Sequence, residues 1–131
     1  MNIKLEKGRA LVLVGPQGCG KSLIAREIAK QHGSYKEVDA DVLENSFELG
    51  EALSSEPRTV VVDGIPTSVA TMRLLKSLIT SNEVVCERRG LEPKTVPAPN
   101  FIFCSGDADA LGHDLGDRRF RVLHLSPEGR A

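Results

Sequence analysis

Apolar runs alternate along this chain with segments in which apolar residues recur at helical spacing. Three runs are apolar almost without interruption, which is typical of strands buried on both faces of a sheet: 10–14, 59–64 and 100–106. Two shorter runs predict further strands: 35–38 and 117–125.

In three other segments, the spacing of the apolar residues predicts helices. The first covers 21–32 and ends near Gly33. The second follows Asp41 and the third follows Thr67 or Ser68, because short polar side chains cap the amides of a first helical turn. The apolar residues expected to face the core are Leu23, Ile24, Ile28 and Ala29, then Val42, Leu43, Phe47, Leu49, Ala52 and Leu53, and then Val69, Met72, Leu75 and Ile79.

This alternation predicts an α/β fold, in which helices connect the strands of a parallel sheet by right-handed crossovers. The segment 83–97 interrupts the alternation, because its pattern indicates two strands with a turn near Gly90. Pro93 and Pro97 exclude it from a central sheet position, so we expect a hairpin that projects from the core. No internal boundary is evident, and 1–131 is expected to form a single domain.

Composition excludes several classes of protein. The net charge of −1 excludes a chain that is basic throughout, so only a local patch would bind nucleic acid. No apolar run of about 18 residues indicates a membrane span, and the first ten residues lack a signal-peptide core, so a cytoplasmic protein is expected. The three cysteines, Cys19, Cys86 and Cys104, form no CxxC pair and are expected to be reduced thiols.

The octapeptide "GPQGCGKS" at 15–22 matches the pattern G-x-x-x-x-G-K-[ST] between a predicted strand and a predicted helix. Glycines let backbone amides turn around phosphates, and a helix N-terminus adds partial positive charge. Lys21 would neutralise the β and γ phosphates, and the Ser22 hydroxyl would ligate Mg²⁺. The residues expected to bind ATP are Gly15, Pro16, Gln17, Gly18, Cys19, Gly20, Lys21, Ser22 and Leu23.

Asp63 ends the apolar run "TVVVD" and would hold Mg²⁺ together with Ser22, directly or through water. The next residue is Gly64, where hydrolytic NTPases usually place a glutamate that orients the attacking water. Asp39 and Asp41 follow the second strand, at the end of the sheet where such sites lie. Either could orient the water, although Asp41 is also the expected helix cap.

These residues make the chain similar to P-loop NTPases, and two branches of that class compete. It resembles the AAA+ class, specifically the helicase superfamily-three-like ATPases of phages and other mobile elements. "GRALVLVGPQGCGKS" and "TVVVDG" look like that family's phosphate loop and second acidic motif, and "EVVCERRGLEPKTVPAP" with "NFIFCSG" looks like its pre-sensor hairpin and sensor strand. The resemblance implies an AAA+ core-like three-layer sandwich with sheet order 5-1-4-3-2, which binds ATP and Mg²⁺. The family's sensor asparagine would fall near Gly106, where Ser105 or Asp107 would have to replace it.

The same resemblance implies a homo-oligomer, a ring such as a hexamer. In that family an arginine finger reaches the γ-phosphate bound by the neighbouring subunit. "DRRFRVLHL" looks like the finger segment, so Arg118 or Arg119 would carry this catalytic role beside Lys21 and Asp63. The family's hairpin contacts DNA or RNA, and the matching basic residues are Arg88, Arg89 and Lys94. The chain would then be an ATPase core without the helical bundle and lid of full helicases.

Two alternatives stay open. "VVVDGIPTS" is similar to the "DGFPR" stretch of adenylate kinases, which need no water-orienting glutamate; "CERRG" would be a short lid, and Arg118, Arg119 and Arg121 would bind phosphate. Thr67, however, stands where that motif has its arginine. The other alternative is a nucleotide-binding module that holds its ligand without turnover and is stabilised by it.

Overall fold

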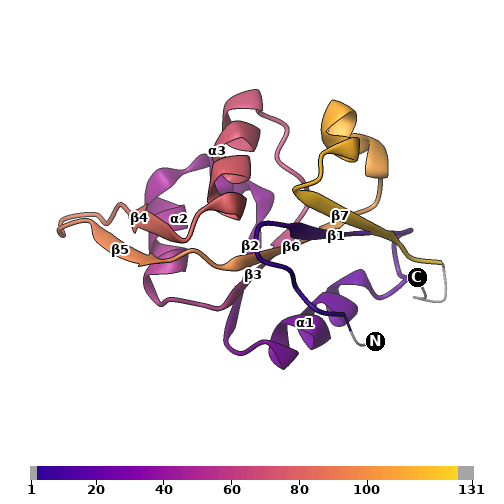
Figure 1. Ribbon diagram of the computed structural model, residues 1–131, viewed down its shortest axis with the longest axis horizontal. Coiled ribbons are helices and arrows are strands. Elements are labelled where there is room, and N and C mark those ends of the chain that lie inside the picture. The colour runs from indigo at the N-terminus through magenta and orange to yellow at the C-terminus, as the bar shows by residue number, and fades with distance from the viewer. Residues whose placement is uncertain (1–2, 127–131) are drawn as a thin grey trace.

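Five parallel strands form the central sheet of the computed structural model, which describes residues 3–126 (Figure 1). They are β1 (Ala10–Val14), β2 (Tyr35–Asp39), β3 (Thr59–Asp63), β6 (Asn100–Ser105) and β7 (Phe120–His124). Their spatial order is β2-β3-β6-β1-β7, and every pairing is parallel. Numbered as five core strands and read from the β7 edge, this order is 5-1-4-3-2.

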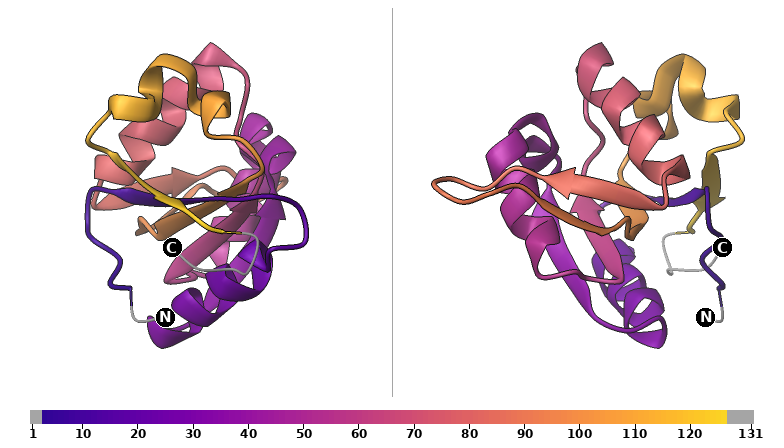
Figure 2. Two further views of the ribbon diagram at one scale, coloured as in Figure 1. Left: turned by 90° about the vertical axis from the view of Figure 1, so that its right-hand side faces the viewer. Right: turned by 60° about the vertical axis from the view of Figure 1, so that its left-hand side comes forward.

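Helices cover both faces of the sheet, which gives three layers (Figures 1 and 2). Helix α1 (Lys21–Gln31) lies on one face and α3 (Val69–Thr80) on the other. Successive strand residues point to opposite faces, so two apolar clusters form. The cluster on the α1 face contains Leu11, Leu13, Val61 and Ile102, and the cluster on the α3 face contains Val12, Val60, Val62, Phe101 and Phe103.

The segment after β2 contains two helical pieces where one helix was predicted. A 3₁₀ helix, η1 (Ala40–Glu44), comes first and α2 (Ser46–Ser54) follows. The predicted cap Asp41 is wrong, because Asn45 lies in an extended conformation between the pieces and its Oδ1 accepts the amides of Phe47 and Glu48 at 3.1 and 3.0 Å. Ser68 is confirmed as the cap of α3, since its Oγ accepts the Thr71 amide at 3.3 Å.

Three apolar residues that were expected to face the core are exposed instead. Leu23, Phe47 and Val69 have 63, 39 and 68% of their surface exposed. Each lies two residues before the first buried residue of its helix. Two residues turn an α-helix by about 200°, so these side chains lie opposite the buried stripe.

Strands β4 (Glu83–Cys86) and β5 (Lys94–Pro97) form a separate antiparallel hairpin. The hairpin projects past α2 and away from the β7 edge of the sheet (Figure 1, and Figure 2, right). The hairpin is fixed to α2 just beyond the end of β4, because the Ser46 hydroxyl donates to a Glu87 carboxylate oxygen at 2.9 Å. A side chain at Gly50 would collide with the Glu87 backbone carbonyl, so glycine permits this close approach.

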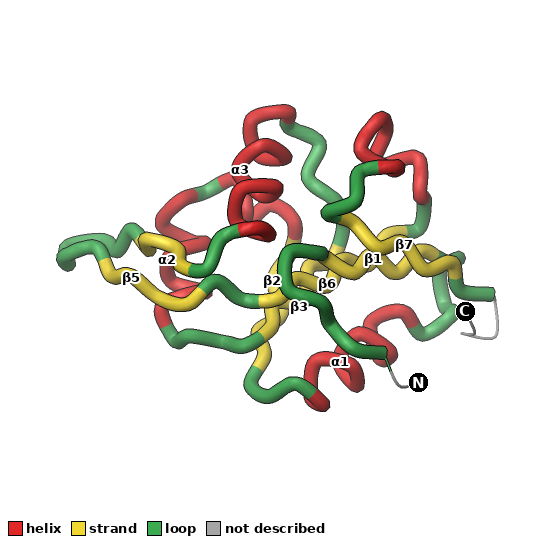
Figure 3. The backbone as a smooth tube through the Cα atoms, in the orientation of Figure 1, coloured by secondary structure: helices red, strands yellow, loops and turns green. Residues whose placement is uncertain are grey.

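A further helical segment, η2 (Ala108–Gly116), lies between β6 and β7 and was not predicted (Figure 3). Gly112 has a φ of 56° and divides it into two short turns, which hides any helical periodicity in the sequence. The Asp107 carboxylate starts the segment by accepting the Asp109 amide at 2.8 Å. Within residues 3–126, no helix is long and apolar enough to cross a membrane.

Candidate functional site

The loop 15–20 joins the carboxyl end of β1 to the amino end of α1. Gly18 and Gly20 have φ values of 84° and 85°, in the left-handed region that favours glycine. A Cβ at Gly15 would lie 2.8 Å from Cys19 Sγ and 3.1 Å from Leu125 Cβ, so this position has no room for a side chain. The glycines of the sequence motif therefore determine the path of this loop.

The first turn of α1 points its amides toward the same loop. Gly20 is the N-cap residue, and within the described chain no side chain caps this helix and no acidic residue occupies its first turn. The first amides of a helix have no intrahelical acceptor and carry the positive end of the helix dipole. This terminus is therefore suited to bind an anion such as a phosphate.

Lys21 lies across the loop. Its Nζ donates to the backbone carbonyl oxygens of Gly15 at 2.7 Å and Pro16 at 3.1 Å. The ammonium group is thus held over the loop by carbonyl oxygens. Phosphate oxygens could replace these acceptors without a large movement of the side chain, since they also accept hydrogen bonds and carry more negative charge.

A cavity of about 450 Å³ opens beside the first turn of α1, at the carboxyl ends of β2 and β3. It brings together side chains that are far apart in the sequence, among them Ser22 and Asp63, which were expected to share a metal. The complete lining comprises Ser22, Arg26, Glu37, Val38, Asp39, Val42, Val61, Asp63 and Cys104. In parallel α/β sheets, ligands bind at this end of the strands.

Asp63 lies between two residues of neighbouring strands at the carboxyl end of the sheet. It is the register partner of Asp39 on β2 and of Cys104 on β6. The residue after it, Gly64, has a φ of 97°, and its amide donates to the Cys104 carbonyl at 2.8 Å. The chain therefore turns away from the strand at Gly64, in a conformation that other residues rarely adopt.

The oxygen atoms of Ser22 and Asp63 fit the coordination habits of Mg²⁺. This ion is usually held by one or two carboxylates together with substrate phosphates and water, and rarely by a complete protein cage. Among residues 3–126 no group of three or more His, Cys, Asp and Glu side chains could hold a metal by itself.

The three cysteines are free thiols, as the sequence predicted. Cys19, Cys86 and Cys104 are all free and buried. Burial raises the pKa of the Cys104 thiol to about 11, and the negative charge of Asp63 adds to this increase. Cys104 is therefore protonated at neutral pH and serves as an apolar wall of the cavity rather than as a nucleophile.

An ion pair lies at the mouth of the cavity. The Arg26 guanidinium contacts both carboxylate oxygens of Glu37, with Nη2 3.2 Å from Oε2 and Nε also bonded to Oε1. Both side chains are about two-fifths exposed, so water weakens the pair. Neither residue was predicted from the sequence to belong to the site, although Glu37 alternates with Asp39 on one face of β2.

Arg118 and Arg119 lie at the amino ends of the strands, whereas the loop 15–20 lies at the carboxyl ends. They precede Phe120, which pairs with Ala10 at the start of β1, whereas the loop follows Val14 at its end. Because the strands are parallel and rise about 3.3 Å per residue, about 15 Å of strand separates the arginines from the loop. Neither arginine is brought to the candidate site of its own chain.

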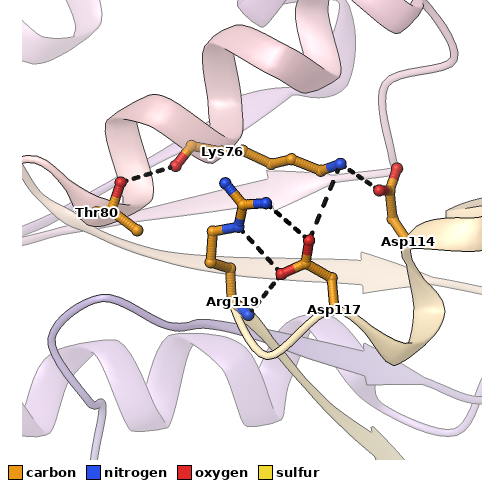
Figure 4. Close-up of polar contacts among 5 residues, drawn as sticks. All are labelled: Lys76, Thr80, Asp114, Asp117 and Arg119. Atoms are coloured by element: carbon orange, nitrogen blue, oxygen red, sulfur yellow. Dashed lines mark hydrogen bonds and ion pairs between the residues drawn. The ribbon is translucent and has the colours of Figure 1, made fainter.

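Arg119 belongs to a network of charges beside α3 (Figure 4). Its guanidinium binds the Asp117 carboxylate at two points, and Asp117 also lies 4.0 Å from the Lys76 ammonium. Lys76 in turn bonds to the buried carboxylate of Asp114. The hydrogen bonds from Arg119 lower the pKa of Asp117 to about 2, so its carboxylate is ionised at neutral pH.

A second cavity, of about 880 Å³, opens at this edge and is predominantly basic. Its lining comprises Gly8, Arg9, Thr80, Asp117, Arg118 and Arg119. Arg9 was not predicted as part of it, and its Nε donates to the Arg118 carbonyl at 2.8 Å. This bond fixes the backbone of the exposed residue Arg118.

The three hairpin residues expected to contact nucleic acid do not act as one group. Arg88 donates to the Glu92 carbonyl across the tip, at 3.0 Å from Nε and 2.7 Å from Nη2. The Arg89 guanidinium lies 5.3 Å from the centre of the Phe47 ring. Lys94 lies in β5, not at the tip, and its Nζ donates to the Ser54 carbonyl at 3.0 Å. Lys94 is thus held against α2 at the start of β5 and lies outside the turn that contains the two arginines.

Solved structures of several proteins share this fold. The structure of the NrS-1 C-terminal region matches with a TM-score of 0.67 and 22% identity over 92% of this chain and 30% of that one. JCV helicase matches with a TM-score of 0.61 and 22% identity, over 94% of this chain and 37% of the helicase chain. NtrX from Brucella abortus, solved in complex with ATP, matches with a TM-score of 0.58 and 21% identity, over 91% of this chain and 33% of the NtrX chain. The chain thus spans about a third of each of these structures and has their P-loop NTPase-like fold.

Sequence comparison defines the family. No curated protein matches the chain significantly. A family model, described as a family of unknown function and designated DUF5906, matches residues 13–119, from the middle of β1 to the residue before β7. The match covers the loop 15–20, Asp63, the hairpin and Arg119. This chain therefore belongs to the DUF5906 family.

Proposed function

We propose that this chain binds ATP with Mg²⁺ in the cavity beside the loop 15–20 and hydrolyses the ATP in a homo-oligomer. One observation carries the proposal: Ser22 and Asp63 line one cleft beside the amino end of α1, where Lys21 lies over the adjoining loop and, within the described chain, no side chain caps the helix. A positive helix end, a lysine and a pair of hard oxygen ligands together match the charge of a magnesium-bound triphosphate.

Each residue has a separate role in this proposal. The α1 amides bind phosphate oxygens, and Lys21 exchanges the carbonyls of Gly15 and Pro16 for the β and γ phosphates. Ser22 and Asp63 hold the magnesium ion, which when bound neutralises charge on the phosphates. The other residues of the phosphate loop, 16–20 and Leu23, contribute backbone contacts.

The arginine that completes the site comes from another subunit. The proposal is supported by the position of Arg118 and Arg119, which lie on the opposite edge of the sheet from their own loop. A head-to-tail contact between two copies would place this edge against the neighbour's cleft. Repeating the contact closes a ring, for example a hexamer, if the rotation permits. The guanidinium would then stabilise the charge of the transferring phosphoryl group.

The projecting hairpin supports a proposal of nucleic-acid binding. The half-buried Arg88 and the exposed Arg89 lie between β4 and β5, in the segment that extends beyond the body of the domain (Figure 2, right). Clustered arginines bind phosphate backbones without sequence preference. Because the chain as a whole has a net charge of −1, this contact would be local and sensitive to salt.

Phosphotransfer to a nucleoside monophosphate has less support. Such an enzyme needs basic side chains around the acceptor phosphate. Arg26 is the arginine that lines the described cavity, and it is paired with Glu37. Arg118 and Arg119 belong to the cavity on the opposite edge.

Analysis of the products formed from ATP distinguishes the functions. ATP with Mg²⁺ is incubated with the chain alone, with single-stranded DNA, and with a panel of nucleoside monophosphates. ADP and inorganic phosphate are expected, and Lys21→Ala should abolish both turnover and ATP binding. Lys30→Ala, an exposed lysine in the last turn of α1, is the matched control. A phosphorylated monophosphate would instead establish a kinase, and ATP binding without turnover would establish a binding module.

A further inference from the structure

Asp39 and Asp63 lie side by side at the carboxyl ends of neighbouring strands. They are register partners of the β2–β3 pair, and both line the cavity that also contains Ser22. Neighbouring strands are about 4.8 Å apart, so a group bound beside Asp63 also lies near Asp39. The two carboxylates therefore face the same ligand space from the α1 side of the sheet.

The carboxylate of Asp39 has no other task in the described structure. Asp39 is the N-cap residue of η1, yet its side chain forms no capping bond. Asp39 is exposed, and among residues 3–126 its carboxylate has no hydrogen-bond or ion-pair partner. By contrast, Glu37 on the same face is occupied by Arg26, and Asp41 does not line the cavity. Asp39 is thus the acidic residue beside Asp63 that is available to a ligand.

The backbone after Asp63 explains why a second carboxylate is needed. A glutamate at position 64 would have to adopt the φ of 97° that Gly64 has there. A residue with a Cβ is strained in this conformation. The polypeptide therefore has no side chain directly after Asp63 that could orient water, and a carboxylate must come from another element.

We propose that Asp39 orients and deprotonates the attacking water, a role that rests on the proposed ATP hydrolysis. The water oxygen forms a bond to the γ-phosphorus while the bond from that phosphorus to the β–γ bridging oxygen breaks. The departing oxygen retains its electron pair as part of ADP. The water proton passes to the Asp39 carboxylate and from there to solvent, which leaves inorganic phosphate and the regenerated carboxylate.

Asp39→Asn tests the role, because it retains the size of the side chain and removes its charge. Under conditions in which the unaltered chain hydrolyses ATP, we expect kcat to fall about 100-fold or more, with KM changed less than about 2-fold. The dissociation constant of MgATP, measured by calorimetry, should stay within about 2-fold. Asp39→Glu should recover part of kcat. Asp41→Asn, in the helix η1 that follows β2 but outside the cavity, should resemble the unaltered chain.

The outcomes separate this inference from the proposed function. An unchanged kcat in Asp39→Asn would overturn the role of Asp39 while leaving ATP hydrolysis intact. A parallel loss of kcat and MgATP affinity would also overturn it, because Asp39 would then be a metal or nucleotide ligand. If the unaltered chain binds ATP without hydrolysing it, the proposed hydrolysis fails and the role of Asp39 fails with it. Circular dichroism verifies that each variant is folded.

Discussion

Arg119 binds the carboxylate of Asp117 at two points, with Nε 3.0 Å from Oδ1 and Nη2 2.9 Å from Oδ2. Its backbone amide also donates to Oδ1, at 2.8 Å. This geometry assigns Arg119 a role in holding the turn before β7. Arg118 is exposed and lies in the same basic cavity, so it is the better candidate for a contact with a neighbouring subunit.

Mixing two inactive variants tests the contact between subunits. Lys21→Ala removes the phosphate lysine and Arg118→Ala removes the finger, so each variant alone should be inactive. In an equal mixture, about one site in four combines an intact loop from one subunit with an intact finger from its neighbour. The mixture should therefore recover about a quarter of the ATPase activity of the unaltered chain. Phosphate release is measured against total protein concentration. No recovery, together with a monomer at every concentration in sedimentation, would exclude a shared site.

Asp117→Asn is expected to change how stability depends on pH. The pKa of Asp117 is about 2 in the folded chain, below its ordinary value of 3.8, because Arg119 favours the ionised form. The ionised carboxylate therefore stabilises the fold above about pH 4, and this contribution is lost as the pH falls toward 2. Urea unfolding between pH 2 and 5 should show a steeper loss in the unaltered chain than in Asp117→Asn. Equal slopes would show that the pair contributes no stability.

Gly64→Ala is expected to lower the free energy of unfolding by about 1–2 kcal/mol, because alanine is strained at positive φ. The steric space is adequate, since a Cβ there would lie 3.5 Å from the Ala40 Cβ. Gly106→Ala is the matched control, since Gly106 lies at the same edge of the sheet and a Cβ there meets nothing within 4 Å. Chemical denaturation measures both variants. A Gly64→Ala variant as stable as the control would contradict the strain at this turn.

The hairpin arginines and the hairpin lysine should have different effects. Replacing Arg88 and Arg89 by alanine should weaken binding of single-stranded DNA and reduce the slope of log K against log salt by about 1–2. Lys94→Ala should lower stability instead, because it removes the bond from Lys94 Nζ to the Ser54 carbonyl and the 3.5 Å ion pair with Glu56. Fluorescence anisotropy at several salt concentrations measures the first effect. DNA affinity unaffected by the arginine replacements would remove the hairpin from the proposed binding surface.

Local patterns in the sequence determined much of the candidate site. The motif at 15–22 predicted the loop, its glycines and the following helix, because the conformation of a few consecutive residues depends mainly on their own chemistry. The apolar run before Asp63 likewise predicted a buried strand that ends in an acid. These features need only the residues next to them in the chain.

Long-range pairing decided the rest. Strand register placed Asp39 directly beside Asp63, and strand direction placed Arg118 and Arg119 at the edge opposite their own loop. The break at Asn45 and the contact of Lys94 with α2 also depend on tertiary packing. Sequence alone determined that this chain has a phosphate loop and an acid near it. Which carboxylate stands beside that acid, and at which end of the sheet the two arginines lie, was decided only when distant strands paired, because pairing sets which residues share an end of the sheet.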